Sequence, residues 1–174
     1  LYLSTSYSLA AAIDAATGTT LWTFDPGTWK RSALRAPDAP ADEGIPTNWG
    51  FVHRGVSYWR DGRTARVYLA TGDAYLFSLD AATGRPDPTF GANGTVDLTV
   101  GLSRPVARTP TGQWRYGVSS PPIVCGDVLV VGSNISDGIT KFNGPPGDVR
   151  GYDLRTGAQR WRFNTIPQEG EFGT

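Results

Sequence analysis

The chain has 174 residues, in which 16 basic and 16 acidic side chains cancel, so the net charge near pH 7 is zero. A balanced charge excludes the basic excess that is typical of proteins that bind nucleic acids. With 22 Gly, 13 Pro and six Trp, the composition favours short strands joined by many tight turns over long helices. No apolar run approaches the roughly 20 residues that a membrane helix needs.

Apolar segments predict strands from the first residues onward. Residues 1–10, LYLSTSYSLA, read as a strand, and alternating apolar residues predict further strands at 67–80 and at 127–137. Three long insertions rich in Pro, Gly or Arg interrupt this pattern, at 27–48, 101–117 and 136–148. Insertions of this length in a compact fold usually carry function, and on a rigid scaffold they tend to build its binding site.

The single cysteine, Cys125, lies in the apolar segment PPIVCGDVLVVG. This setting predicts a small buried core residue. One cysteine forms no disulfide within the chain and supplies no cysteine cluster for a metal ion.

A short motif recurs three times along the chain. DAATG occurs at 14–18 and again at 80–84, and the looser copy DLRTG occurs at 153–157. Extended in both directions, the copies occupy 12–22, 78–90 and 151–161, and each ends in an aromatic residue. The Asp can accept backbone N–H bonds from the residues that follow it, and the Gly can adopt a positive φ. Each copy therefore predicts a hairpin connector followed by an outer strand that carries an aromatic anchor.

A repeat of about 70 residues that holds several strands is typical of a propeller blade with insertions. Each blade buries its faces against its neighbours, and an aromatic residue at its edge can fix one blade to the next. We therefore expect an all-β fold, an arc of about two and a half blades of a β-propeller, that occupies residues 1–174 as one partial domain. Because a propeller needs several blades to close its ring, we interpret the chain as an internal piece of a longer protein.

These repeats and four further segments resemble the quinoprotein dehydrogenases that use pyrroloquinoline quinone (PQQ), in particular their glucose-dehydrogenase-like branch. The segment HRGVSYW at 53–59 resembles the N-R-G-V-x-x-W segment of that family. Residues 69–98 are similar to its T-x-D-G-x-L-x-A-L-D-A-x-T-G continuation, 119–138 to S-x-P-P-V-V…V-G-S-x-V-S-D-N, and 147–173 to G-D-V-R-A-x-D-x-R-T-G. The resemblance covers essentially the whole chain. It implies an eight-bladed propeller, tryptophan-docking motifs at the three repeats, and PQQ and Ca²⁺ as cofactors.

The resemblance also implies which residues contact PQQ, a flat tricarboxylate ortho-quinone. Arg54 matches an arginine that contacts the cofactor, and a guanidinium suits the bidentate recognition of carboxylate or quinone oxygens. Ser119 matches a hydroxyl that binds a PQQ carboxylate, and Ser133 and Asn134 fall in a loop that contacts the cofactor. Without the resemblance, Arg54 reads as part of a surface or structural ion pair, and Ser119 as a turn-capping serine.

Asp137 is the candidate metal ligand that the resemblance implies. In this family an acidic residue at this point supports the Ca²⁺ site, and Ca²⁺ prefers oxygen ligands that include carboxylates. On its own, Asp137-Gly138 is a turn signal. The branch has Asn in place of Gly138, so one polar contact is lost here.

No catalytic residue is assigned from the sequence. The family's catalytic base is an Asp on a later blade, and it lies outside residues 1–174. The only histidine, His53, adjoins Arg54 and is interpreted as a structural or cofactor-adjacent residue, with a direct catalytic role as the alternative.

By resemblance, we expect a dehydrogenase that oxidises a sugar, polyol or alcohol and passes electrons to ubiquinone or a cytochrome. A periplasmic location is implied, with any membrane association made through other parts of the protein. One alternative is a non-catalytic propeller, such as the scaffolding lipoprotein of outer-membrane assembly. Another is an alcohol dehydrogenase with a fused cytochrome domain. The isolated arc is expected to be inactive and not to fold alone, because it leaves two blade faces uncovered.

Overall fold

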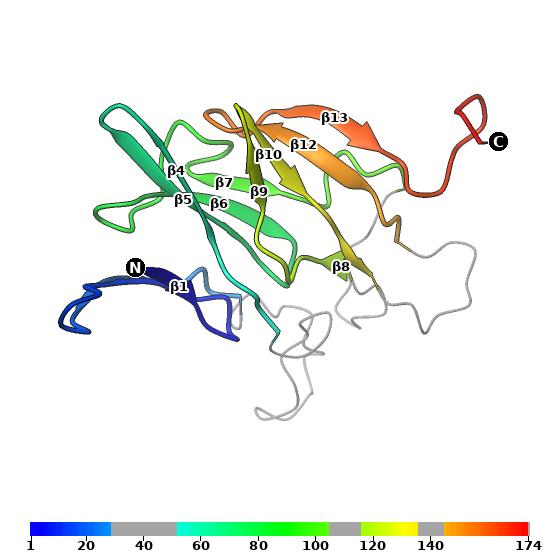
Figure 1. Cartoon of the computed structure of the whole chain (residues 1–174). Coiled ribbons are helices and arrows are strands. Elements are labelled where there is room, and N and C mark those ends of the chain that lie inside the picture. The colour runs from blue at the N-terminus through cyan, green and yellow to red at the C-terminus, as the bar shows by residue number, and fades with distance from the viewer. Residues whose placement is uncertain (29–51, 105–115, 136–144, 174) are drawn as a thin grey trace, which may run out of the picture.

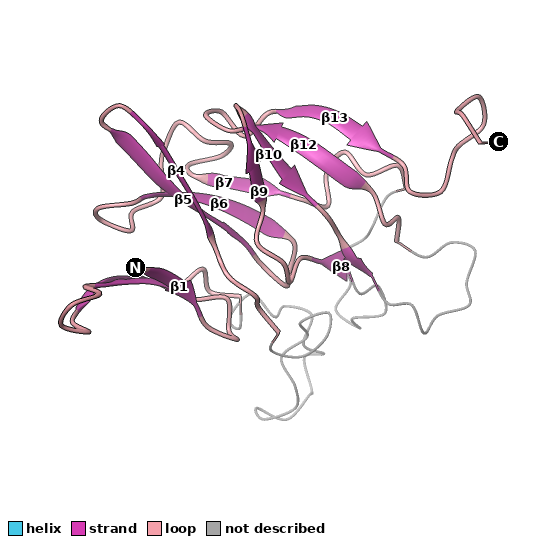
Figure 2. Ribbon diagram, in the orientation of Figure 1, coloured by secondary structure: helices cyan, strands magenta, loops and turns pink. Residues whose placement is uncertain are grey.

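The computed structural model describes residues 1–28, 52–104, 116–135 and 145–173. Within these ranges every regular element is a strand, and no helix there could cross a membrane. Figure 2 shows the strands joined by short turns and loops. The all-β prediction is therefore confirmed.

Eleven of the strands form three antiparallel sheets that follow one another along the chain (Figure 1). Blade 1 has three strands: β1 (Tyr2–Ser4), β2 (Ala10–Ile13) and β3 (Thr20–Phe24). Blade 2 has four: β4 (Ser57–Asp61), β5 (Thr64–Ala70), β6 (Tyr75–Asp80) and β7 (Thr95–Asp97). Blade 3 also has four: β9 (Ile123–Cys125), β10 (Val128–Val131), β12 (Val149–Asp153) and β13 (Gln159–Phe163). Two full blades and three strands of another confirm the predicted propeller arc.

A small fourth sheet was not predicted from the sequence. It pairs β8 (Tyr116–Gly117) with β11 (Asn134–Ile135), and the register places Asn134 opposite Gly117. This sheet connects the chain that enters blade 3 to the chain that leaves β10. It lies beside the pocket described below.

The core consists of two apolar clusters, one in each seam between successive blades. Val67 and Leu69 of β5 belong to the cluster shared with blade 1, whereas Tyr68 and Ala70 belong to the cluster shared with blade 3. Successive side chains of a strand point to opposite faces of its sheet. The inner strands β5 and β6 of blade 2 are therefore buried on both faces, which explains why they read as nearly continuous apolar runs.

Trp22 of β3 joins blade 1 to blade 2. Its indole Nε1–H donates a hydrogen bond of 3.0 Å to the carbonyl oxygen of Ala81. Its ring lies on Gly84 so closely that a Cβ there would come within 2.5 Å of Cε3 of the indole. The aromatic residue of one repeat thus packs on the Thr-Gly turn of the next.

The seam between blades 2 and 3 repeats this arrangement with a phenylalanine. The ring of Phe90 lies against Gly157, and the N–H of Gly91 donates to the carbonyl oxygen of Thr156 at 2.8 Å. Phe90 itself precedes β7, so the prediction that the aromatic sits on an outer strand is wrong for this copy. This copy has two more residues between its Gly and its aromatic than the other copies have. Pro86 and Pro88 lie in that stretch, and they lack the N–H groups that strand pairing needs.

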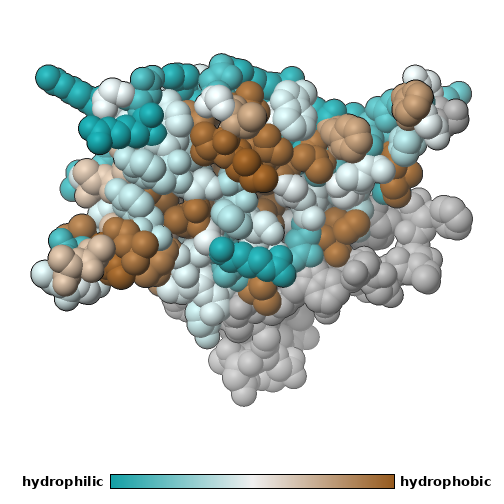
Figure 3. Space-filling model, in the orientation of Figure 1, coloured by the Kyte–Doolittle hydropathy of each residue, from teal (hydrophilic) through white to brown (hydrophobic). Residues whose placement is uncertain are grey.

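The outer face of blade 3 carries exposed apolar side chains. Ile123, Trp161 and Phe163 are 64%, 40% and 62% exposed. Figure 3 shows hydrophobic surface gathered over the part of the molecule where β9, β10, β12 and β13 lie. Cys125 is exposed as well, so its predicted burial is wrong in this structure. It ends β9, the edge strand of blade 3, which no fourth blade covers in the structure.

Candidate cofactor site

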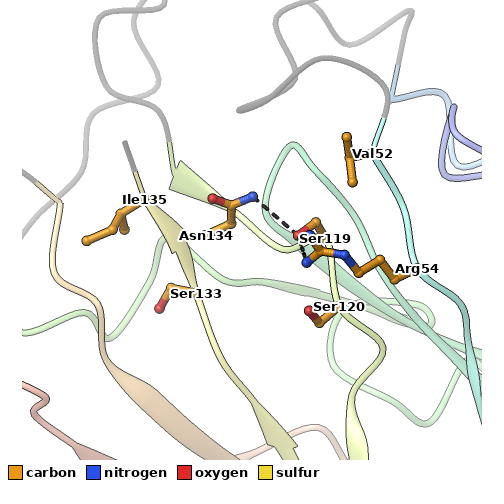
Figure 4. A pocket seen from close by; sticks show the side chains of 7 residues that line it. All are labelled: Val52, Arg54, Ser119, Ser120, Ser133, Asn134 and Ile135. Atoms are coloured by element: carbon orange, nitrogen blue, oxygen red, sulfur yellow. Dashed lines mark hydrogen bonds between the residues drawn. The ribbon is translucent and has the colours of Figure 1, made fainter. Parts of the chain in front are cut away.

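Arg54, Ser119, Ser133 and Asn134 come together around one pocket of about 570 Å³. Val52, Ser120 and Ile135 complete its described lining (Figure 4). The four residues come from segments that are up to 80 positions apart, counting from 54 to 134. The structure brings them together, and their role as cofactor contacts stays a prediction.

The main chain fixes Arg54 beside Ser119. The backbone N–H of Arg54 donates to the carbonyl oxygen of Ser119 at 2.9 Å. Shortly afterwards the hydroxyl of Ser57 donates to the carbonyl oxygen of Pro122. Two contacts to backbone carbonyl groups therefore hold Arg54 and the start of β4 against the segment that precedes β9.

The hydroxyl of Ser119 is the meeting point of the site (Figure 4). Its Oγ accepts hydrogen bonds from Nη1 of Arg54 at 3.4 Å and from Nδ2 of Asn134 at 3.3 Å. A serine hydroxyl has one proton to donate and two lone pairs to accept with. Because both lone pairs are used, the proton of Ser119 is left to donate to a group in the pocket.

Ser133 lines the same pocket, but its hydroxyl is directed elsewhere. It donates to the carbonyl oxygen of Asp148 at 2.6 Å. In Figure 4 its side chain points away from Arg54 and Asn134. In this arrangement Ser133 has no proton left to offer an acceptor in the pocket.

The described lining favours an anionic ligand. Arg54 is its only charged side chain, and no carboxylate is present among these seven residues. A guanidinium with neutral hydroxyl and amide groups beside it suits carboxylate or quinone oxygens. Val52 and Ile135 add apolar surface, as in most small-molecule sites. The donor set thus fits a flat polycarboxylate such as PQQ.

The sequence did not indicate the remaining members of the lining. Val52, Ser120 and Ile135 each lie next to, or two positions from, a predicted residue. Adjacency to those residues was the only signal that could have pointed to them.

His53 is not among the residues that line the pocket. Its Nε2 lies 2.6 Å from the carbonyl oxygen of Ala70, and its Nδ1 lies 2.7 Å from Oγ of Ser4. Burial lowers the pKa of the imidazole, and the hydrogen bond to Ala70 opposes that effect. The structure therefore places His53 beside the site, between blades 1 and 2, in agreement with the structural reading.

Asp137 lies outside the described residues, so its role as a Ca²⁺ ligand stays a prediction. Among the described residues, no group of three or more His, Cys, Asp and Glu side chains could hold a metal ion. The described lining also offers no carboxylate for a calcium ion. These residues alone therefore do not form a Ca²⁺ site.

Fold and pocket together define a partial β-propeller with a pocket beside its last two blades, in whose described lining Arg54 is the charged residue. The chain belongs to the PQQ family described as "Glucose/ethanol/alcohol dehydrogenase, beta-propeller domain", whose model matches residues 1–174. The resemblance drawn from the sequence is thereby confirmed for the family.

Several curated proteins are similar to nearly the whole chain. The dehydrogenase subunit of alcohol dehydrogenase (quinone) from Gluconacetobacter polyoxogenes is 33% identical over 96% of this chain and 18% of its own length. Quinoprotein glucose dehydrogenase A from Acinetobacter calcoaceticus is 29% identical over 95% of this chain and 20% of its own length. The chain thus spans about a fifth of the length of these relatives.

Among solved structures, quinohemoprotein alcohol dehydrogenase from Comamonas testosteroni aligns with 97% of this chain and 20% of its own, with a TM-score of 0.69. Its sequence identity is 24%, so this likeness shows the fold alone. Relatives described as alcohol dehydrogenases and relatives described as glucose dehydrogenases are both similar to the chain.

Proposed function

We propose that the chain supplies one arc of a complete propeller that binds PQQ and oxidises a sugar, polyol or alcohol. The observation that carries the proposal is the convergence of Arg54, Ser119 and Asn134 on one pocket. Membership of the PQQ family supports it. A scaffold propeller has no evident need for this set of donors.

The roles of the residues follow from their hydrogen-bonding groups. When bound, PQQ supplies an ortho-quinone that takes up a hydride from the substrate. Arg54 would bind an anionic oxygen of the cofactor, and Ser119 would donate its remaining proton to a second oxygen. Asn134 would hold the Ser119 hydroxyl in place, because its amide already donates to that oxygen. Val52 and Ile135 would exclude water from the cofactor's apolar face.

Three further features, a Ca²⁺ ligand, an electron acceptor and a cellular location, are supported by the sequence resemblance. Asp137 would contribute a carboxylate to a Ca²⁺ ion beside the cofactor. Electrons would pass to ubiquinone or a cytochrome, and the protein would work in the periplasm. The base that removes the substrate's hydroxyl proton would come from a later blade.

The role of Arg54 is tested by titrating PQQ into the apo form of the complete propeller and following the quenching of tryptophan fluorescence. We expect Arg54→Ala to raise the Kd for PQQ by about 10- to 100-fold, the value of a hydrogen bond to a charged group. Arg60→Ala is the matched control, because Arg60 lies exposed on β4 and is not part of the described pocket lining. Equal affinity in Arg54→Ala and the native protein would refute the proposed site.

Activity is tested separately by dye-linked oxidation of glucose, other aldoses, polyols and simple alcohols. The apo-protein is supplied with PQQ in the presence and absence of Ca²⁺. Turnover that requires both additions is the expected result. Turnover with PQQ alone would remove Ca²⁺ from the proposal. Absence of both PQQ binding and turnover would favour the scaffold alternative.

A further inference from the structure

The imidazole of His53 uses both ring nitrogens across the seam between blades 1 and 2. A carbonyl oxygen can only accept, so Nε2 carries the proton and donates to Ala70 at 2.6 Å. In the neutral ring Nδ1 is then an acceptor, and the Ser4 hydroxyl lies 2.7 Å from it. The N–H of Gly55 is also directed at Nδ1, at 3.4 Å. All three partners are satisfied by one tautomer of a neutral histidine.

These contacts belong to a short segment that touches all three blades. His53 binds Ser4 of blade 1 and Ala70 of blade 2. The next residue, Arg54, donates its backbone N–H to Ser119, on the segment that leads into blade 3. The guanidinium of Arg54 then reaches Oγ of the same serine. The main-chain position of Arg54, from which its side chain extends, is therefore fixed by the contacts of His53 on one side and by Ser119 on the other.

We propose that His53 is a positioning residue, which fixes the main chain of Arg54 so that its guanidinium meets the anionic cofactor. The inference rests on the proposed function, because it assigns His53 a part in binding at that site. A long arginine side chain carries much rotational freedom, and binding is tighter when that freedom is restricted beforehand. His53 does not touch the ligand, and its effect on binding passes through Arg54.

The test is a double-mutant cycle on PQQ affinity in the complete propeller. His53→Phe keeps an aromatic ring but removes all three hydrogen bonds, and Arg54→Ala removes the group that His53 positions. We expect His53→Phe to raise the Kd for PQQ about tenfold when Arg54 is present and less than twofold in the Arg54→Ala background. A purely structural role predicts the same fold-change in both backgrounds, because effects of independent residues add.

Two further variants keep the test decisive if His53→Phe fails to fold. Ser4→Ala removes the hydroxyl partner of Nδ1, in a strand that supplies no residue to the described pocket lining, and should weaken binding only when Arg54 is present. Thr19→Ala, which removes a hydroxyl from the outer turn of the same blade, is its control and should leave the Kd unchanged. His53→Gln, which retains a donor and an acceptor, should recover part of the lost affinity.

The possible failures are distinguishable. If Arg54→Ala leaves the Kd unchanged, the proposed function fails. If Arg54→Ala weakens binding but His53→Phe and Ser4→Ala act equally in both backgrounds, the proposed function stands and the positioning role of His53 is overturned. An unchanged Kd in both of these variants would overturn it as well.

Discussion

The seam between blades 1 and 2 depends on the absence of a single side chain at Gly84. This residue has a φ of +71°, a conformation that residues with a Cβ rarely adopt. It also lies directly beneath the indole of Trp22. Backbone conformation and packing therefore both require glycine at this position.

Gly84→Ala should lower the free energy of unfolding by about 2 to 4 kcal/mol, because it adds backbone strain and overpacks the seam. Gly62→Ala is the matched control: Gly62 has a φ of +56°, but a Cβ added there would meet no atom within 4 Å. Gly62→Ala should lower the free energy of unfolding by about 1 kcal/mol, which is the contribution of backbone strain alone. Urea unfolding of the complete propeller measures both, and equal losses would show that Trp22 contributes nothing through this contact.

The sequence predicted which side chains gather at the site but not how each one is used. Arg54, Ser119 and Asn134 were recognised from motifs, and they meet at one hydroxyl. The direction of the Ser133 hydroxyl depends on the Asp148 carbonyl, which is 15 positions away and reaches it through the fold. Ser4 and Ala70, the partners of His53 in blades 1 and 2, are likewise distant in sequence, so no local pattern could indicate them.

At the level of elements, the three repeated turns share one hydrogen-bond pattern. Oδ1 of Asp14, Asp80 and Asp153 accepts two backbone N–H groups and the hydroxyl of the following Thr in every copy. The third turn adds Arg160, whose guanidinium binds Oδ2 of Asp153 at 2.5 Å. These local contacts explain why the motif was a reliable predictor of each turn.

The carboxylate of Asp153 makes the stability of this turn depend on pH. Burial raises the pKa of this carboxyl, but hydrogen bonds outweigh that effect and lower the pKa from 3.8 to about 2. The larger contributions come from the N–H of Thr156 and the guanidinium of Arg160, and smaller ones come from the Thr156 hydroxyl and the N–H of Arg155. A pKa that is lowered by folding stabilises the protein above about pH 4, and this contribution is lost as the pH falls toward 2.

Asp153→Asn should therefore be less stable than the native protein at pH 6, and the difference should shrink as the pH falls to 3. Urea midpoints of the complete propeller at pH 6, 4 and 3 measure the trend. Asp14→Asn is the comparison without an arginine: the hydrogen bonds from Thr17 and Ala16 lower the pKa of Asp14 as well, so its stability difference should shrink in the same direction. A constant difference across this range would contradict the role of the charge.

Other elements lay beyond what the sequence could predict. The sheet of β8 and β11 has strands of two residues each, too short to show an alternating pattern. In the middle repeat, prolines displaced the aromatic from the strand, although its contact with the next turn was kept. The contact between the aromatic residue and the next turn is thus retained in the middle repeat, although the strand that carries the aromatic residue in the other repeats is not.

At the scale of the whole molecule, the arc ends in apolar surface on the outer face of blade 3. Ile123, Trp161 and Phe163 lie there exposed, on strands of one sheet. Exposed apolar patches and open sheet edges favour association. In each seam between blades, apolar side chains from two blades pack together. On the outer face of blade 3, only the apolar side chains of blade 3 are present among the described residues.

We expect the 174-residue chain, prepared alone, to self-associate rather than to behave as a monomer. Sedimentation velocity over a range of concentrations measures this, and Ile123→Lys with Phe163→Lys should shift the distribution toward smaller species by placing charge on the patch. Ala82→Lys with Ala92→Lys, at two exposed positions in the turns of blade 2, is the control for added charge. A monomer at every concentration that melts cooperatively would contradict the prediction.

The order of the contacts along the chain has a consequence for how the protein is made. Trp22 precedes the glycine that receives it at position 84, and Phe90 precedes the one at position 157. At the usual rates of synthesis, of roughly 5 to 20 residues per second, each ring waits about 3 to 13 s for its partner to be made. For most of its synthesis the nascent chain therefore displays one uncovered aromatic ring, which a chaperone could bind until the next blade covers it.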